Sequence, residues 1–221
     1  MQVVLHIVIL DENGFAAGLF RTIRERKGRK AKTNAGRLDE AVAVLNRALA
    51  LDPLSPALHS DLGVFYLNFG QFDRAIPYFR KTLELDSSFF WARLNLGWSH
   101  LFTGDTSEAL TEFQDMVKLA PLSPYSQQAL GYAYGVTGRH DEALDVLTNL
   151  DQFAKTRYVP PSAKAYVYLG LGQKEVALDY LDKGYAERDT EMIFLRRGPW
   201  LSPLRNEPRF QALLKKMALD K

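Results

Sequence analysis

Apolar and polar residues alternate with a helical period from about residue 35 to residue 187, and this pattern repeats every 34 residues. Apolar side chains recur at the spacing found on the buried face of an amphipathic helix. Two columns mark the register most clearly: glycine stands at positions 36, 70, 104, 138 and 172, and alanine at positions 41, 75, 109, 143 and 177. A fixed period of this length predicts tandem units, each of which is one pair of helices.

Each column has a physical reason for its residue type. The glycine column falls between two apolar stretches, where a left-handed residue ends one helix, so we predict that these glycines form the turns of helix hairpins. The columns that include Gly63 and Ala75 let paired helices approach closely, while columns of large side chains fill the space between layers. The register predicts helix pairs at residues 56–69 with 72–86, 90–103 with 106–119, 124–137 with 140–152, and 162–171 with 174–187.

Helix starts are also marked in the sequence. Ser55 and Ser123 each precede a proline, which predicts a serine N-cap followed by proline at the first helical position. Residues 105–108 read Asp-Thr-Ser-Glu, the pattern of a capping box. Pro161 and Lys164 interrupt the pattern of the last unit, so we expect its first helix to be short.

One unit shows the signature of a known family in the order Leu62, Gly63, Tyr66, Gly70, Ala75 and Phe79. This signature, with its period, resembles the tetratricopeptide repeat. The resemblance departs at His59, where the signature has tryptophan, and at Thr82 and Met116, where it has alanine. It implies an all-α fold, a right-handed α-solenoid of antiparallel helix hairpins, with a half repeat and four full repeats over residues 35–191.

The segment after the repeats, residues 192–221, contains Trp-Leu-Ser-Pro-Leu-Arg and Pro-Arg-Phe sequences. It resembles the tail that closes many bacterial repeat proteins of this kind, some of them attached to sensor kinases or winged-helix regulators. We interpret it as a C-terminal capping segment, because the last repeat must cover its apolar face.

The first repeat lacks a convincing first helix. Its register would place Glu25, Arg29 and Lys32 at apolar positions, and the run from Arg21 to Lys32 holds seven basic residues and one acid. We therefore expect residues 1–34 to be a poorly ordered basic segment, or the chain to be a fragment or mis-started product of a longer one. The alternative is that Val3–Leu10 and Phe15–Phe20 fold back onto the first repeat. Binding of the basic run to nucleic acid or anionic membrane is a weaker alternative.

Composition narrows the class of protein further. The chain has 221 residues, 47% of them hydrophobic, and a net charge of +2, which is typical of a globular protein with a sizeable core. It has no cysteine, so disulfides and thiolate metal sites are excluded. The longest apolar run, Val3–Leu10, is too short to cross a membrane, and the start of the chain lacks the charge of a signal peptide, so we expect a cytoplasmic protein.

Catalytic and cofactor motifs are not found. The histidines are His6, His59, His100 and His140, and none is spaced as a metal-binding pair. His100 shares its column with tyrosines, so we expect a packed interhelical side chain. The sequence has no phosphate-binding loop and no nucleophile elbow, and we expect neither a cofactor nor an enzyme.

A groove is the remaining candidate site. In the resembled family the first helix of each pair lines the concave face, and here those positions are aromatic and nearly uncharged. We expect an exposed wall that anchors a peptide or helix of a partner protein, with Asn amides bonding the partner's backbone. The candidate partner-binding residues are Asn68, Trp91, Asn95, Trp98, Phe102, Tyr125, Tyr132 and Tyr166. Alternatively, these rings are core, or the C-terminal segment lies against them.

The function implied is that of a non-catalytic scaffold for protein–protein interaction. Members of the resembled family that bind the acidic C-termini of chaperones use a clamp of Lys, Asn and Arg. The matching residues here are Ser60, Val64, Asn95, Tyr125 and Ala129, so we do not expect such a tail as the partner. The alternative role is a C-terminal interaction or sensor module of a larger signalling or transcription regulator.

Overall fold

The computed structural model describes residues 34–196 and 198–219 of the chain. The predicted basic segment lies outside this range, apart from its last residue, so its order and its ligands stay predictions. The described chain forms two compact units, which are divided inside one helix between Ala92 and Arg93. We call the part up to Ala92 unit 1 and the part from Arg93 unit 2.

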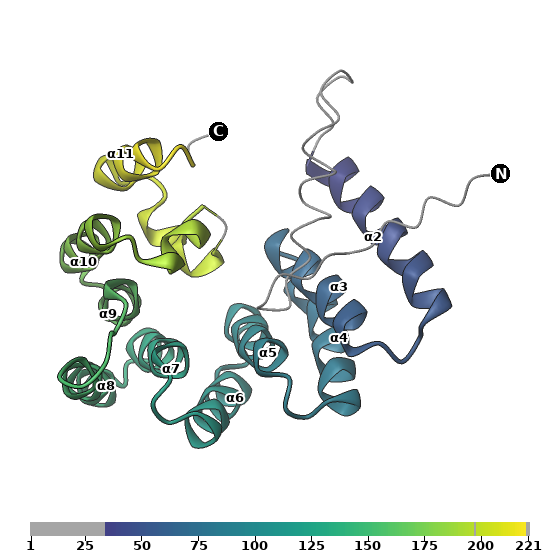
Figure 1. The fold of residues 1–221 in the computed structure, drawn as a ribbon, viewed down its shortest axis with the longest axis horizontal. Helices are drawn as coiled ribbons and strands as arrows, with labels where there is room; N and C mark the ends of the chain where they lie inside the picture. Colours follow the sequence, from purple (N-terminus) through teal and green to yellow (C-terminus); the bar gives the residue numbers. More distant parts are fainter. Residues whose placement is uncertain (1–33, 197, 220–221) are drawn as a thin grey trace. The chain divides into compact units, whose positions relative to one another are not determined.

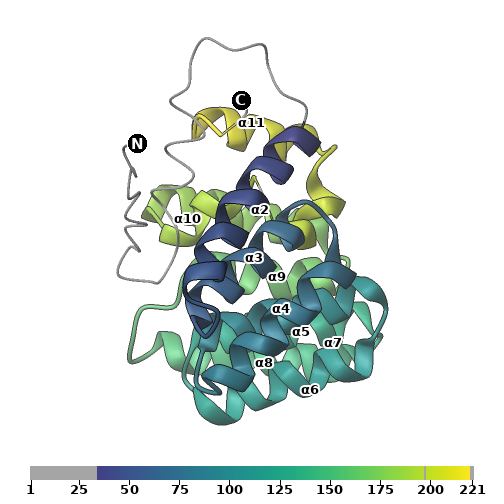
Figure 2. The ribbon, with the colours of Figure 1, turned by 90° about the vertical axis from the view of Figure 1, so that its right-hand side faces the viewer.

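Unit 1 contains α2 (Asn34–Leu51), α3 (Pro56–Asn68) and α4 (Phe72–Leu85), with α2 packed on α3 and α3 paired with α4 (Figures 1 and 2). Ser55 is the N-cap of α3, as predicted, and its Oγ accepts a hydrogen bond from the backbone N–H of Leu58 at 3.4 Å. The α3–α4 turn passes through Gly70, whose φ of +71° is a left-handed conformation that glycine adopts without strain. The predicted hairpin of unit 1 is therefore confirmed.

Unit 2 continues with the same kind of hairpin. The helix α5 (Phe90–Thr103), which unit 2 contains from Arg93 on, is followed by α6 (Thr106–Leu119), α7 (Pro124–Val136), α8 (His140–Ala154), α9 (Pro161–Gly170) and α10 (Lys174–Glu187). The glycines of the three turns have φ values of +91°, +79° and +76°. The first helix of the last pair, α9, has only 10 residues, which confirms the predicted shortening.

The repeats pack through small residues that face large ones. A Cβ atom on Gly97 of α5 would lie 2.4 Å from the ring of Phe113 on α6, so only glycine fits there. Similarly, a Cβ atom on Gly135 of α7 would lie 2.4 Å from the backbone of Gly170 on α9. Backbone contact between α7 and α9 holds the first helices of the last two repeats close together, and these are the helices that carry the candidate site.

Two details of the predicted elements are wrong. Gly36 lies inside α2, which begins at Asn34, so it does not form a hairpin turn. Helix-forming residues on both sides carry the helix through this glycine at a cost of about 1 kcal/mol. Asp105 precedes α6, but its side chain makes no capping hydrogen bond. The Asp105 carboxylate lies 3.3 Å from Nδ1 of His100 instead, and the buried His100 confirms the predicted packed side chain.

The C-terminal segment forms two 3₁₀ helices, η1 (Thr190–Phe194) and η2 (Pro199–Leu204), and a last helix, α11 (Pro208–Lys216). Among its elements, η1 and α11 pack on α10, and η2 packs on α9. In Figure 1 the yellow-green η2 region lies on the inner side of unit 2, where α7 and α9 face it. The segment therefore covers the last hairpin and also reaches the inner face of earlier repeats.

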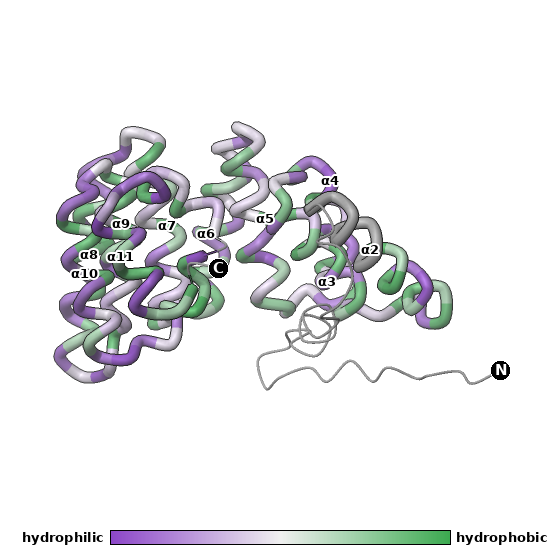
Figure 3. Tube along the Cα trace, turned by 90° about the horizontal axis from the view of Figure 1, so that it is seen from above, coloured by the Kyte–Doolittle hydropathy of each residue, from purple (hydrophilic) through white to green (hydrophobic). Residues whose placement is uncertain are grey.

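Green and purple alternate along the helices in Figure 3, as expected for amphipathic helices that bury one face. The residues that the structure describes form helices and no strands, in agreement with the predicted all-α class. Within the same residues, no helix combines the length and apolar character needed to span a membrane.

Candidate functional site

A column of three aromatic side chains lies on the inner face of unit 2. Trp98 of α5, Tyr132 of α7 and Tyr166 of α9 hold equivalent positions in three successive repeats. The three residues, which we call the ring column, come together because the first helices of these repeats lie side by side. This part of the predicted wall is therefore formed as a set of neighbouring rings.

The ring column is in contact with Trp200 of η2. The indole of Trp200 is stacked on that of Trp98, with ring centroids 4.7 Å apart and planes inclined by 24°. It meets the ring of Tyr166 edge-on at 6.2 Å. The Oη of Tyr132 donates a hydrogen bond to the backbone carbonyl oxygen of Trp200 at 3.2 Å. Each member of the ring column thus contacts the C-terminal segment.

Burial of the ring column contradicts one expectation from the sequence. Trp98 is 2% exposed, Tyr132 5% and Tyr166 2%, so these rings do not form an exposed patch. The physical reason is that the chain's own C-terminal segment covers them, which was the alternative left open above. Burial raises the pKa of Tyr132 to about 12, and it also raises the pKa of Tyr166, so both hydroxyls stay protonated and can donate.

A second group of contacts joins η1 to the starts of α7 and α9. Tyr125 Oη donates a hydrogen bond to Glu191 Oε1 at 3.0 Å. The carboxylate of Asp189 accepts hydrogen bonds from the backbone N–H groups of Ser162, at 3.0 Å, and of Glu191, at 2.9 Å. Asp189 therefore caps the first turn of α9, for which the local sequence offers only prolines.

Electrostatics around these carboxylates are unusual. Burial raises the pKa of Glu191 to about 7, the charge of Asp189 acts in the same direction, and the hydrogen bond from Tyr125 opposes the shift. The pKa of Tyr125 is raised by burial and by the charge of Glu191. The predicted site residue Tyr125 therefore lies beside acidic groups and is engaged by them.

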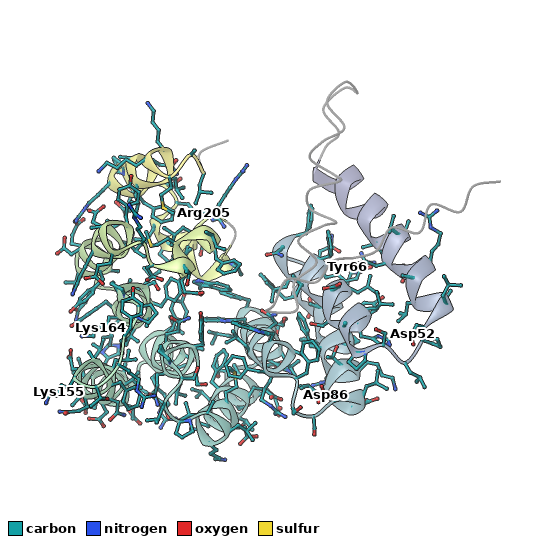
Figure 4. The ribbon with its side chains drawn as sticks, in the orientation of Figure 1. Asp52, Tyr66, Asp86, Lys155, Lys164 and Arg205 are labelled. Carbon is teal, nitrogen blue, oxygen red and sulfur yellow. The ribbon has the colours of Figure 1, made fainter. Side chains whose placement is uncertain are left out.

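An arginine side chain bonds two backbone carbonyl groups of the loop that carries Trp200. The guanidinium of Arg205, labelled in Figure 4, donates to the backbone carbonyl oxygens of Arg196 at 3.3 Å and Gly198 at 3.4 Å. Leu201 and Leu204 on the same loop are fully buried, whereas Trp200 is partly exposed. Two leucines and one arginine thus set the shape of the loop.

Two buried polar atoms at the site, Nε1 of Trp200 and Oη of Tyr166, form no hydrogen bond of standard geometry with the described residues, although the Trp200 N–H lies close enough to Tyr166 to oppose the rise in its pKa that burial causes. Buried donors and acceptors are normally paired, because an unpaired one loses its hydration without compensation. The contact between Trp200 and the ring column is therefore close in its packing but incomplete in its hydrogen bonding.

The other predicted residues are partly exposed. Asn68 ends α3, and Trp91, which meets the ring of Phe90 edge-on at 5.3 Å, is in the first turn of α5. Both belong to unit 1. Asn95 and Phe102 belong to unit 2, where the ring of Phe102 stacks on Trp98 at 6.0 Å.

Sequence reasoning missed Trp200, Asp189 and Glu191 as members of this site. The Gly-Pro-Trp-Leu sequence after the last repeat was a usable signal, because a tryptophan between two prolines outside the repeat pattern needs a place to pack. No sequence pattern distinguishes Asp189 or Glu191 as site residues, since single carboxylates near helix ends are common.

The described residues include no group of three or more His, Cys, Asp or Glu side chains that could hold a metal ion. The Nε2 of His59 lies 3.1 Å from the carbonyl oxygen of Pro53, so this histidine is a packed loop contact.

Solved structures with the same fold include TTC0263, described as a thermophilic TPR protein in Thermus thermophilus, at 21% identity and a TM-score of 0.56; the match covers 82% of this chain and 92% of that one. A double mutant of MamA RS-1 matches at 20% identity and a TM-score of 0.51, over 82% of this chain and 98% of that one. Another MamA structure matches at 20% identity and a TM-score of 0.50, over 74% and 98%. Identities of this size show a shared fold, the α-solenoid that the repeat predicts.

Curated protein sequences yield no match to the chain. Family models named tetratricopeptide repeat match residues 30–88, 68–131 and 125–147. Together these matches run from residue 30 to residue 147, more than half of the chain, and they cover the described helices from α2 to α7 and the first part of α8. The chain therefore belongs to the tetratricopeptide repeat family.

Proposed function

We propose that this protein is a non-catalytic scaffold that binds a peptide or helix of another protein on the inner face of its repeats. The observation that carries the proposal is that the ring column already holds a peptide segment, the η2 loop of the chain itself. Aromatic side chains at equivalent positions of successive repeats, with a tyrosine hydroxyl that bonds a backbone carbonyl, are suited to hold a peptide.

Within unit 2, Asn95 extends this face beyond the ring column. Asn95 lies one helical turn before Trp98 on α5, and its amide offers a donor and an acceptor to a peptide backbone. In unit 1, Asn68 is proposed as a contact because of its amide, and Trp91 is proposed as an aromatic contact. The role as interaction module of a larger signalling or transcription regulator, like the cytoplasmic location, stays a prediction.

Site-specific photo-crosslinking tests this function. A benzophenone amino acid at position 95 would lie on the proposed contact face, and the same group at position 108, an exposed position on α6, is the matched control. We expect a crosslinked protein adduct from position 95 that is absent from position 108. Equal adducts from both positions, or adducts from position 108 alone, would contradict the proposed face.

A further inference from the structure

The ring column binds Trp200 through two groups of that one residue. Its indole stacks on Trp98, and its backbone carbonyl oxygen accepts the hydrogen bond from Tyr132 at 3.2 Å. Any peptide with an aromatic residue can offer a ring and the carbonyl of the same residue. The contacts therefore require only that an occupant present an aromatic side chain and an accessible backbone carbonyl. They do not require a long specific sequence.

The present occupant leaves part of this chemistry unused. The Oη of Tyr166 is buried and can donate and accept; the indole N–H of Trp200 lies close enough to oppose the rise in its pKa that burial causes, but the two groups do not meet in standard hydrogen-bond geometry. Trp200 is also partly exposed, whereas the next residue, Leu201, is fully buried. A different occupant that bonds the hydroxyl of Tyr166 in standard geometry would gain a better hydrogen bond than Trp200 forms there.

Both ends of the C-terminal segment are attached independently of Trp200. At one end, Asp189 accepts the hydrogen bond from the start of α9. At the other, the guanidinium of Arg209 on α11 donates to Asp179 and Asp182 of α10, at 2.7 Å each. The indole can therefore leave the ring column while the segment stays attached, and a tethered group of this kind competes at high effective concentration.

We propose that the ring column is the binding site for a partner segment that presents an indole or similar aromatic side chain, and that Trp200 occupies this site in cis as a competitor. The inference rests on the proposed function and adds the chemistry of the partner and the regulation of the site. A partner binds only to molecules in which Trp200 has left the ring column. Its apparent affinity is therefore its intrinsic affinity multiplied by the fraction of such molecules.

The test uses the full chain and a fluorescent peptide of residues 196–206, with a second peptide in which alanine replaces the tryptophan. Binding is measured by fluorescence anisotropy to the wild type, to Trp200→Ala and to Leu150→Ala. Leu150 is fully buried on α8 among residues away from the ring column, so this variant controls for general loosening of the core. Circular dichroism and thermal melting establish that each variant is folded. Trp200→Leu, which keeps apolar volume but has no aromatic ring, replaces Trp200→Ala if the latter fails to fold.

We expect the tryptophan peptide to bind Trp200→Ala at least about tenfold more tightly than the wild type, because the tethered competitor has been removed. The alanine peptide and the Leu150→Ala variant should show no such gain. Three results would overturn the inference: no binding to folded Trp200→Ala, equal binding to wild type and Trp200→Ala, or an equal gain from Leu150→Ala.

The two proposals fail separately. If the peptide does not bind Trp200→Ala but position 95 still crosslinks a partner, the scaffold function stands and the partner uses other residues. If the peptide binds as expected but position 95 gives no adduct, the ring column is a binding site and the wider contact face is wrong.

Discussion

The indoles of Trp98 and Trp200 are stacked 4.7 Å apart, and Trp98 also meets Phe113 and Tyr132 edge-on, at 5.2 Å and 5.1 Å. Trp98 thus lies at the centre of an aromatic cluster that joins three helices of unit 2 to the C-terminal segment. A residue in this position has two roles that are normally separate. It belongs to the core of the repeats, and it is also the surface on which the η2 loop is bound.

Replacing Trp98 by alanine should therefore destabilise unit 2 strongly. The side chain is 2% exposed, and removing a buried aromatic ring of this size costs roughly 3 to 5 kcal/mol through lost contacts and the cavity that remains. Urea denaturation followed by circular dichroism measures the effect. Trp91→Ala, at a partly exposed position, is the control and should cost much less. An unchanged midpoint for Trp98→Ala would mean that the ring is not core.

Gly97→Ala tests the packing inside the α5–α6 hairpin. The added Cβ atom would lie 2.4 Å from Cε1 of Phe113, whose ring is fully buried and has no free space to enter. Overpacking of this kind costs about 1 to 3 kcal/mol, which exceeds the gain in helix propensity of at most about 1 kcal/mol. Ser107→Ala, on the exposed side of α6, should change the melting temperature little. A more stable Gly97→Ala protein would contradict the packing described.

The hairpins could be predicted because their determinants are local and repeated. Gly70 and its equivalents must adopt a left-handed conformation, and Gly97 must face Phe113, so each repeat specifies its own turn and its own packing. Gly36 shows the limit of this reasoning: it holds the same position in the register, yet it lies inside α2, so the register alone does not determine the conformation of a glycine.

The site could be predicted only in part, since its final state depends on contacts between residues far apart in the sequence. The register placed Trp98, Tyr132 and Tyr166 on one face correctly. It did not reveal that Trp200 covers them, because the C-terminal segment lies outside the repeat and its docking depends on the shape of the inner face. The link between Tyr125 and Glu191 is equally non-local.

Glu191 should make stability depend on pH. Its pKa is about 7 in the folded protein, above the ordinary value of 4.5, mainly because of burial. Between these two values the folded state keeps a proton that the unfolded state releases, so stability falls as pH rises through this window. Glu191→Gln retains an acceptor for Tyr125 and removes the charge. It should be more stable than the wild type at pH 8, by an amount on the order of 2 kcal/mol, and nearly equal to it at pH 4.

Burial also raises the pKa of Asp61 in unit 1, to about 7, so its effect on stability has the same direction as that of Glu191. Glu191→Gln should therefore remove only part of the pH dependence. Thermal melting of both proteins across this pH range measures the difference. A Glu191→Gln variant that is less stable than the wild type at pH 8 would show that the carboxylate is favourably bound, contrary to the raised pKa.

Arg209 should hold α11 on α10. Its guanidinium donates to Asp179 and Asp182, and Glu175 lies 3.6 Å away, so one arginine serves three carboxylates. Because the group is exposed, we expect a small loss of global stability from Arg209→Ala, below about 1 kcal/mol, but faster hydrogen exchange in α11. Arg209→Lys should restore protection only partly, since an ammonium group cannot form the paired contacts of the guanidinium. Unchanged exchange in Arg209→Ala would mean that apolar contacts alone hold the helix.

The last prediction is that an acidic chaperone C-terminal tail does not bind. The positions that match the known clamp offer no cation, and two of them, Ser60 and Ala129, are buried. The structure adds a further reason, because Tyr125 lies beside the carboxylates of Glu191 and Asp189. A carboxylate brought there would be desolvated next to like charges, which is strongly unfavourable. Calorimetry with such a peptide should give a Kd weaker than about 1 mM, a binding free energy smaller than about 4 kcal/mol. Glu191→Gln, which removes one repelling charge but adds no cation, should not rescue binding, so micromolar affinity in either protein would contradict this account of the site.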